Sequence, residues 1–480
     1  MGTTTAGPEL LVELDRSARR PLHAQLEDGL RQAIRSGRLV ARSRLPSTRA
    51  LAADLGVSRR MVVDAYSQLL AEGYLEARQG AGTYVAETAV APRPATIESR
   101  PRPPAFDFFP GSPDLSTFPR RAWLRALRET LREAPDQALA YPDPRGAPEL
   151  RRALAGHLSR VRGVVANPEA ILVCAGVSQG LAFVARALGV ARIAVEDPSL
   201  PVHRAILEAR GASLSPLAVD EDGARVEDLP RLAREVGPIG AVLVTPAHQS
   251  PTGVALSSAR RAALVAWAKD SASVIVEDDY DAEFRYDRAP LGALQGLAPD
   301  RVLYMGTVSK TLAPGLRLGW IVAPANLYER IVEQRMLADQ GSPTIDQLAL
   351  ARLLDGGAYD SHLRQARRRY RARRDALVRA VAEHLPGARV TGVAAGLHAI
   401  VRLARAVDGL QLMELARSHD VGVYPLGYGY MRPRPVDADL ALGYANLAEP
   451  AIEEGIRRLA AALAELPPAA PTNDGGAIAR

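Results

Sequence analysis

The sequence predicts a two-domain α/β protein, with a small helical domain closed by a β-hairpin and a larger domain built on a mainly parallel sheet. Three observations support this fold class. Residues 21–85 hold three stretches with helical spacing of apolar residues, followed by two short strand-like runs around glycines. A proline-rich stretch comes next. From Phe106 onward, apolar runs such as AILVCAG and ASVIVEDDY alternate with amphipathic stretches, which is typical of parallel strands covered by helices.

These changes in composition place the domain boundaries. We expect the first domain to cover residues 14–86, a semi-extended linker to cover 87–105, and the second domain to cover 106–466. The tail 467–480, PPAAPTNDGGAIAR, is predicted to be disordered. A chain of 480 residues is long enough for two or more hydrophobic cores.

Charge is distributed unevenly along the chain. The net charge is +6, yet residues 14–86 alone hold twelve arginines against seven acidic residues, which leaves +5 on the first domain. The single cysteine, Cys174, excludes an intramolecular disulfide, and its place in AILVCAG predicts a core residue. No leader-like start or long apolar run is visible, and together with the single cysteine this predicts a cytoplasmic protein with no membrane span. We expect no metal site.

The first domain has the order of elements of a winged helix-turn-helix. Apolar residues recur with helical spacing in PLHAQLEDGLRQAIRSG, which ends at Gly37. Ser47 is placed to cap a second helix and Ser58 a third, SRRMVVDAYSQLLAEG. YLEARQGAGTYVAE then reads as two strands around a glycine-containing turn. We expect the third helix to be the recognition helix, with its first turn towards the major groove of double-stranded DNA.

The arginines of this domain fit that docking. Arg59 and Arg60 lie at the start of the recognition helix, where the helix dipole disfavours a cation, so a phosphate or guanine edge would offset the cost. Arg44 and Arg49 flank the start of the second helix, and Gly80 allows close approach of the hairpin to a DNA backbone. The alternative is that these arginines form a solvated face, but the ordered pattern favours DNA binding.

Residues 21–85 closely resemble the GntR family of bacterial regulators. The match is carried by PLHAQLEDGLRQAIRSGRL and RLPSTRALAADLGVSRRMVVDAYSQLLAEGYLEARQGAGTYV. In that family the arginine of the PSTR segment, the first turn of the third helix and the wing glycine touch DNA. The resemblance therefore implies DNA contacts at Arg49, Ser58, Arg59, Arg60, Met61 and Gly80.

Lys310 is the main candidate for a reactive residue in the second domain. The chain has only two lysines, Lys269 and Lys310, and the second lies in GTVSKTLAPGLRLGW after an apolar run. An arginine could carry charge there but could not become a neutral amine nucleophile. The alternative is a stray surface lysine, which the buried strand end and the lysine-poor composition disfavour.

Other reactive side chains follow neighbouring strand-like runs. In open α/β sheets ligands bind at the carboxyl ends of strands, so these groups are expected to converge with Lys310. They are Asp278, Tyr280, Thr307, Ser309, His248, Gln249 and Arg317. Pyridoxal phosphate needs such a set, since its aldehyde condenses with lysine, its ring nitrogen needs a carboxylate and its phosphate needs hydroxyls and an arginine.

Residues 106–465 also resemble the fold-type I aminotransferases, through VTPAHQSPTG, IVEDDYDAEF and GTVSKTLAPGLRLGW. The resemblance implies that Lys310 forms the Schiff base, that Asp278 pairs with the pyridine nitrogen and that Tyr280 contacts the cofactor phenolate. Asp279 is the rival for the nitrogen, and His248 or Gln249 matches the region near the ring oxygen. The phosphate would be held by Thr307, Ser309, Arg317 and Ser178.

The two domains together resemble the MocR/GabR-like subfamily of the GntR family. This implies a head-to-tail homodimer that binds paired DNA half-sites and responds to a small amine, an amino acid or pyridoxal phosphate itself. The leading hypothesis is a transcriptional regulator that depends on pyridoxal phosphate. A functional aminotransferase with a regulatory DNA-binding head, and a DNA-binding protein whose body is only a dimerisation scaffold, remain as alternatives.

Two positions depart from the pattern of these families. Leu200 in EDPSL stands where relatives often place an aromatic ring over the cofactor. Ala441 in LALGYANL stands where many transaminases hold the substrate carboxylate with an arginine, although Arg432 and Arg434 lie nearby in sequence. Because efficient transamination needs a clamped carboxylate, we expect at most residual enzyme activity.

Overall fold

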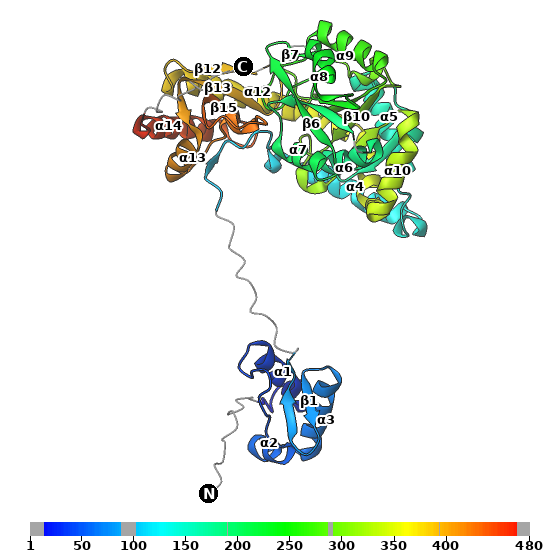
Figure 1. Ribbon diagram of the computed structural model, residues 1–480, viewed down its shortest axis with the longest axis vertical. Coiled ribbons are helices and arrows are strands. Elements are labelled where there is room, and N and C mark those ends of the chain that lie inside the picture. The colour runs from blue at the N-terminus through cyan, green and yellow to red at the C-terminus, as the bar shows by residue number, and fades with distance from the viewer. Residues whose placement is uncertain (1–13, 88–101, 190, 287–290, 393, 468–480) are drawn as a thin grey trace. The chain divides into compact units, whose positions relative to one another are not determined.

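The chain divides into two compact units, Met1–Pro101 and Arg102–Arg480, called here the head and the body. The computed structural model describes residues 14–87, 102–189, 191–286, 291–392 and 394–467 (Figure 1). Most of the predicted linker and tail, 88–101 and 468–480, falls outside the described residues, as does the start of the chain.

The head is a winged helix-turn-helix, as predicted. Its elements are α1 (Leu22–Arg35), α2 (Thr48–Leu55), α3 (Arg59–Ala71), β1 (Leu75–Arg78) and β2 (Gly82–Val85). The apolar residues with helical spacing form one core, in which Leu26, Leu30, Leu51, Val62 and Leu69 are almost fully buried.

Both predicted serine caps are present in the head. The Ser47 hydroxyl accepts a hydrogen bond from the Ala50 amide at 3.1 Å, and the Ser58 hydroxyl accepts one from the Met61 amide at 3.3 Å. The two strands pair antiparallel. Their turn needs glycine, since Gly80 and Gly82 have φ angles of 75° and 110°.

The body contains an eight-stranded, mainly parallel sheet, which confirms the predicted fold class. Its strand order is β4-β11-β10-β9-β8-β5-β6-β7. β11 runs antiparallel to both of its neighbours and β7 antiparallel to β6, whereas the other pairs are parallel. The strands are β4 (Ile171–Cys174), β5 (Arg192–Asp197), β6 (Ser213–Asp220), β7 (Gly223–Ala224), β8 (Ala241–Val244), β9 (Val274–Asp279), β10 (Val302–Thr307) and β11 (Gly319–Val322).

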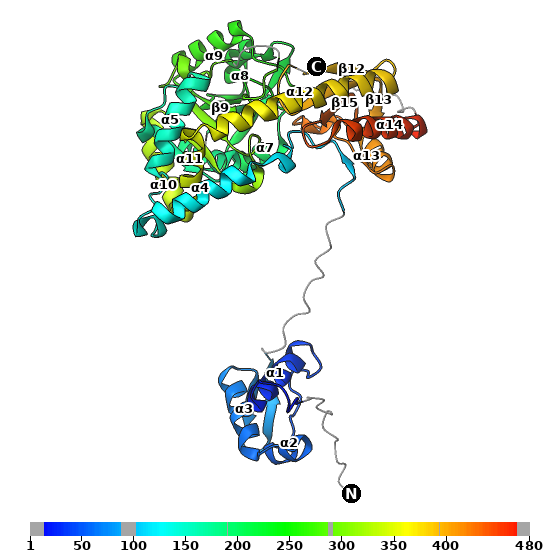
Figure 2. The same ribbon diagram turned by 180° about the vertical axis from the view of Figure 1, so that it is seen from behind.

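Helices cover both faces of this sheet (Figures 1 and 2). One face packs against α6 (Val177–Leu188), α7 (Pro201–Glu208) and α10 (Ala325–Asp339). The other packs against α5 (Pro148–Arg162), α8 (Leu229–Val236), α9 (Ser258–Asp270) and α11 (Thr344–Asp355), with α4 (Arg120–Glu133) against α11. Since side chains alternate along a strand, neighbouring residues of β9 enter different cores: Val276 packs with the first group and Ile275 with the second.

A smaller antiparallel sheet follows the long helix α12 (Ala358–His384), which joins the two parts of the body in Figure 2. This sheet has the order β12-β13-β15, with β12 (Arg389–Thr391), β13 (His398–Asp408) and β15 (Val436–Gly443). The helices α13 (Gly409–Ser418) and α14 (Glu449–Glu465) contact it or each other.

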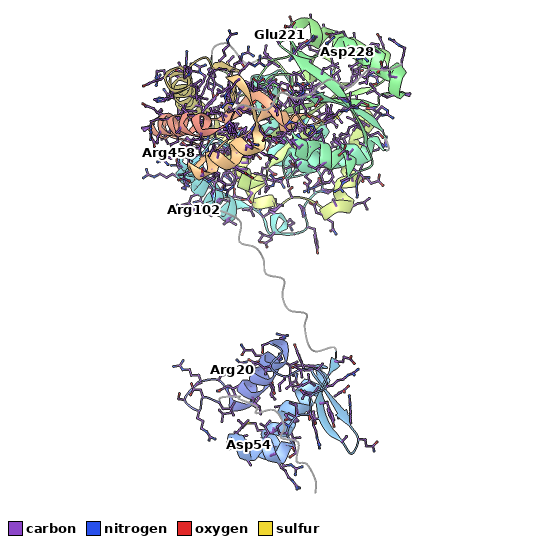
Figure 3. The ribbon with its side chains drawn as sticks, turned by 60° about the vertical axis from the view of Figure 1, so that its left-hand side comes forward. Arg20, Asp54, Arg102, Glu221, Asp228 and Arg458 are labelled. Atoms are coloured by element: carbon purple, nitrogen blue, oxygen red, sulfur yellow. The ribbon has the colours of Figure 1, made fainter. Side chains whose placement is uncertain are left out.

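The first strand of the body is fixed to this smaller part. β3 (Phe106–Asp107) pairs in parallel with β14 (Val421–Gly422). The guanidinium of Arg458, labelled in Figure 3, lies over the Phe106 ring at 4.7 Å from its centre. Among the described residues, no helix combines the length and the apolar character needed to span a membrane.

Candidate cofactor site and nucleic-acid interface

The carboxyl ends of β9 and β10 bring the predicted reactive groups together. The two strands are parallel neighbours, with Asp278 paired to Met305 in register. Tyr280 follows β9, and Lys310 follows the last residue of β10, Thr307. The turn after β8 adds His248, whose ring contacts the Tyr280 hydroxyl. Asp278, Tyr280, His248 and Lys310 therefore lie at one edge of the sheet.

The amine of Lys310 is largely withdrawn from solvent. A Cβ built on Gly111 would lie 3.2 Å from Nζ, so this glycine leaves the amine its space. Burial lowers the pKa of Lys310, while the negative charges of Asp281 and Asp278 act in the opposite direction. Because its pKa is lowered, a larger fraction of this amine is neutral and nucleophilic at a given pH than at an exposed lysine.

Asp278 is a buried carboxyl with spare hydrogen-bonding capacity. Its side chain is 3% exposed, and Oδ1 has no hydrogen-bond partner among the described residues. The other oxygen lies 3.8 Å from Nδ1 of His203 on α7. Burial raises the pKa of Asp278 to about 8, and the nearby carboxylates Asp279 and Asp281 add to the rise.

Asp279, its neighbour, is already fully engaged on the opposite face of the sheet. Its two oxygens accept hydrogen bonds from the Arg162 guanidinium at 2.7 and 3.1 Å. The Tyr304 hydroxyl donates a third bond at 2.7 Å. All three side chains are buried. The two adjacent carboxylates thus differ: Asp278 has an oxygen with no partner in the described part of the chain, and Asp279 completes a buried ion pair.

Tyr280 is surrounded by polar groups in a buried setting. Its hydroxyl lies 3.0 Å from Nδ1 of His248, and the same nitrogen lies 3.1 Å from Oδ2 of Asp281. Burial raises the pKa of Tyr280 well above its usual value, and a hydrogen bond with the Ser250 side chain acts in the opposite direction. The phenol is therefore a protonated donor at neutral pH.

Gln249 uses its side chain to hold the turn after β8. Its Nε2 donates to the carbonyls of Pro198 and Ser250, each at 2.9 Å. Its Oε1 accepts from the Thr252 amide at 2.9 Å. A direct contact of Gln249 with a cofactor stays a prediction.

The predicted phosphate residues lie around the N-terminus of α6. The hydroxyls of Thr307 and Ser309 are 2.8 Å apart. The Arg317 guanidinium donates to the carbonyl of Ala175, and a Cβ on Gly176 would lie 3.3 Å from that guanidinium. Ser178 occupies the first turn of α6, where backbone N–H groups lack helical partners and favour anions.

A small cavity beside Asp278 contains residues that sequence reasoning missed. It is lined by Glu196, His203 and Ser250 together with the predicted Leu200. Burial raises the pKa of Glu196 to about 7 and lowers that of His203 to about 4. Glu196 could have been found as a polar residue near the end of a strand-like run, and His203 as the nearest histidine after EDPSL.

The two departures from the family pattern have defined surroundings. Ala441 is 4% exposed and packs with Ile400, Leu426 and Tyr430 in an apolar cluster. The guanidinium of Arg434 lies over the Tyr430 ring, 3.7 Å from its centre. Ala441, at the position where many transaminases have an arginine, thus packs against apolar side chains.

The head presents cations at the predicted interface. Arg49 and Arg59 are exposed, and neither makes an ion pair with any described residue. Arg60 is 4.0 Å from Asp64 and has a 92% exposed side chain. Arg44 lies along the wing, since a Cβ on Gly82 would be 3.2 Å from its Nε. The exposed Ser58, Gly80 and half-buried Met61 complete the predicted set.

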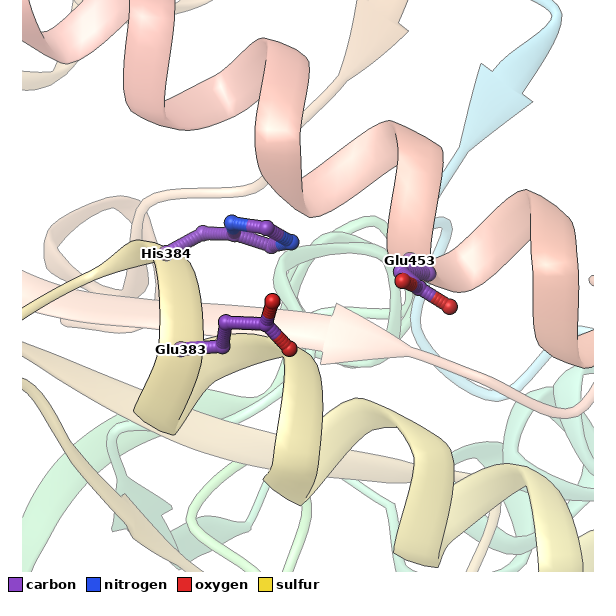
Figure 4. A group of neighbouring side chains, drawn as sticks. All are labelled: Glu383, His384 and Glu453. Atoms are coloured by element: carbon purple, nitrogen blue, oxygen red, sulfur yellow. The ribbon is translucent and has the colours of Figure 1, made fainter.

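One group in the body has metal-type ligands, although the sequence predicted no metal site. Glu383 and His384 at the end of α12 and Glu453 on α14 bring ligand atoms within 4.8 Å of one another (Figure 4). Both glutamates are exposed, and exposed acidic groups are common without a metal. We therefore assign no metal to this group.

Known proteins match both units. The family model "Bacterial regulatory proteins, gntR family" matches residues 22–85, and "Aminotransferase class I and II" matches residues 111–459. The probable rhizopine catabolism regulatory protein MocR of Rhizobium meliloti is 34% identical over 95% of this chain and 96% of its own length. The pyridoxine biosynthesis transcriptional regulator PdxR of Corynebacterium glutamicum is 36% identical over 80% and 84%.

The chain belongs to the GntR-type transcriptional regulators that carry a class I and II aminotransferase domain. The body is also similar to solved enzymes. The kynurenine aminotransferase of Pyrococcus horikoshii, solved with PMP, has a TM-score of 0.70 at 28% identity, over 75% of this chain and 91% of that chain. This regulator therefore joins a DNA-binding head to a fold-type I body, and pyridoxal phosphate is the cofactor of that fold.

The donor set of this regulator fits pyridoxal phosphate. A pyridinium N–H needs a buried acceptor, and Oδ1 of Asp278 is buried and unpartnered among the described residues. The aldehyde needs an amine, which Lys310 supplies. The glycine at 176 keeps side-chain atoms away from the Arg317 guanidinium at the phosphate end.

Proposed function

We propose that this protein is a transcriptional regulator whose body holds pyridoxal phosphate on Lys310 and uses it to sense a small amine or the vitamin itself. The observation that carries the proposal is that two groups lie at one sheet edge: an Asp278 oxygen that is buried and has no hydrogen-bond partner among the described residues, and the largely buried amine of Lys310. When bound, the cofactor supplies an aldehyde that exchanges between the lysine amine and a free amine. Such a ligand can change DNA binding only if it binds two states of the protein with different affinities.

The predicted residues around the cofactor divide three tasks in this proposal. Asp278 holds the proton on the ring nitrogen, and burial behind α7 keeps water away from it. Tyr280 donates its proton to the ring oxygen. The phosphate end is bound by Thr307, Ser309, Arg317, Ser178 and the first backbone amides of α6. Asp279 is excluded from the ring nitrogen because Arg162 and Tyr304 occupy its oxygens.

The head is proposed to read DNA through its recognition helix and wing. Support comes from exposed Arg49 and Arg59, which have no ion pair in the described part of the chain, at the start of two adjacent helices. We propose a head-to-tail homodimer that reads two half-sites in the cytoplasm, where bacterial DNA lies. The apolar residues Leu124 and Leu131, one heptad apart on α4, are 57% and 63% exposed and offer the body a surface for self-association.

The aminotransferase alternative is disfavoured by one contact. Ala441 occupies the position where a transaminase would clamp a carboxylate, and its neighbours Ile400 and Leu426 are apolar. Without that clamp, an amino acid is not oriented for repeated proton transfer. The proposed effector is therefore an amine recognised without a strong carboxylate contact, or pyridoxal phosphate itself. The relative PdxR is named for pyridoxine biosynthesis, which supports the second option.

The chain offers a matched pair of lysines for the deciding experiment. The purified full chain is mixed with pyridoxal phosphate and its visible absorption is recorded. Lys310→Ala should abolish the lysine-linked band, whereas Lys269→Ala should retain it, because Lys269 is exposed on α9.

Operator binding is measured with duplexes selected from a random pool by the wild-type chain. The proposal fails if Lys310→Ala keeps the band, or if neither vitamin B6 forms nor a panel of amines alters duplex affinity. Keto-acid production at ordinary enzyme rates would favour the alternative.

A further inference from the structure

A buried polar cluster lies directly behind the Tyr280 phenol. His248 contacts both Tyr280 and Asp281 through its Nδ1, at 3.0 and 3.1 Å. The ring of His398 on β13 lies 5.2 Å from the His248 ring, centre to centre. Each of these side chains is at most 8% exposed. The charge of Lys310 also acts on this cluster, through Asp281 and His398.

The Asp281 carboxylate determines which nitrogen of His248 carries the proton. A carboxylate oxygen at 3.1 Å from an unprotonated nitrogen would set two lone pairs against each other. The proton of the imidazole therefore lies on Nδ1, where Asp281 accepts it. Because the Tyr280 oxygen lies at 3.0 Å from the same nitrogen, the one N–H is shared between Asp281 and Tyr280 as a three-centre hydrogen bond, in which the Tyr280 oxygen accepts and does not donate. The phenol keeps its own proton for another partner.

The ring of His248 is held in a narrow slot between two glycines. A Cβ on Gly396 would lie 2.0 Å from Cε1 of His248, and a Cβ on Gly253 would lie 3.3 Å from Nε2. Both glycines have left-handed φ angles, 81° and 76°. The ring of His398 is fixed in turn, because its Nε2 lies 2.8 Å from the Pro251 carbonyl. The two glycines thus confine the plane of the His248 ring, and its Nδ1 lies towards the phenol.

We propose that His248 is a positioning residue for the cofactor site: its Nδ1–H, fixed by Asp281, donates to the Tyr280 oxygen and leaves the Tyr280 proton directed at the ring oxygen of pyridoxal phosphate. Ser250, which also hydrogen-bonds with Tyr280, lines the cavity beside Asp278. His248 therefore acts through Tyr280 and does not itself touch the cofactor. The inference rests on the proposed function, because it needs the cofactor on Lys310.

The test is a pH titration of the visible absorption of the full chain loaded with pyridoxal phosphate. Loss of a proton from the lysine–cofactor link leaves negative charge on the ring oxygen, which a donor at Tyr280 stabilises. Tyr280→Phe should therefore raise the midpoint of the titration. His248→Leu should raise it in the same direction by about half to one pH unit, as expected for one weakened hydrogen bond. Asp281 is a poor test site, because its charge also acts on Lys310 directly.

Two further variants separate positioning from general damage. His248→Asn places an amide N–H close to the original Nδ1 and should restore the wild-type midpoint. In a Tyr280→Phe background, His248→Leu should cause no additional shift, since its route to the cofactor is already removed. Equal shifts in the Leu and Asn variants, no shift in either, or additive shifts in the double variant would each overturn the inference. A wild-type chain with no visible band would instead overturn the proposed function, and this inference with it.

Discussion

Gly111 lies directly against the amine of Lys310: a Cβ at this glycine would be 3.2 Å from Nζ and 3.6 Å from Cε. The φ angle of Gly111 is 74°, so an alanine there would be both strained and close to the amine. We expect Gly111→Ala to weaken the uptake of pyridoxal phosphate, by about tenfold if the crowding costs about 1.4 kcal/mol. Absorption titration with the cofactor measures this change.

The chain contains a matched control for this glycine. Gly357 has a φ angle of 70°, and a Cβ there would meet no atom within 4 Å. Gly357→Ala should lower the free energy of unfolding by roughly 1 kcal/mol, through backbone strain alone, and leave cofactor uptake unchanged. If both variants lost cofactor equally, general strain rather than crowding of the amine would explain the effect.

The parts of the site that follow strand ends could be predicted from the sequence. Lys310, Asp278 and Tyr280 follow β-like apolar runs, and parallel strands bring such ends to one edge. His203 could not be placed, because it reaches Asp278 from α7 and depends on how that helix packs against the sheet. The engagement of Asp279 by Arg162 could not be predicted either, since 117 residues separate them and only the folded α5 brings them together.

The head was easier to predict because its signals are local. The caps at Ser47 and Ser58 act within three residues, and the wing glycines act within one turn. By contrast, the Gln249 contacts depend on a turn whose backbone carbonyls accept its amide. A sequence motif places such a residue near a site but does not show which of its atoms remain free.

Asp278 should make the stability of the cofactor-free body depend on pH. Its folded pKa is raised to about 8, above an unfolded value near 4. When folding raises the pKa of an acid, the folded state binds the proton more tightly than the unfolded state does. The stability that the protonated acid allows is therefore complete below about pH 4 and is lost as the pH rises towards 8. Asp278→Asn should remove this part of the decline, on the order of a few kcal/mol. Urea unfolding of cofactor-free protein at pH 5 and pH 8 measures it; an identical pH dependence in the variant and wild type would contradict the assignment.

Asp279→Asn should destabilise the body, in contrast to Asp278→Asn. This substitution leaves the buried Arg162 without its carboxylate, and breaking such a pair costs about 3–5 kcal/mol. Tyr304→Phe removes only one hydrogen bond to the same carboxylate and should cost about 1 kcal/mol. Urea unfolding at pH 7 distinguishes the two. If Asp279→Asn were no more harmful than Tyr304→Phe, the buried ion pair would not be a main support of the body.

The exposed arginines of the head give a prediction about DNA alone. Arg49→Ala or Arg59→Ala should weaken binding to a selected duplex by roughly tenfold and lower the slope of log affinity against log salt by about one, because each lost phosphate contact releases one counterion fewer. Arg38→Ala removes the same charge from an exposed position after α1 and outside the predicted interface, so it serves as the control. The visible absorption of the loaded body should stay unchanged in all three variants, because none of the three arginines belongs to the unit that holds Lys310. Wild-type affinity in both the Arg49 and Arg59 variants would mean that the head meets DNA through a different face.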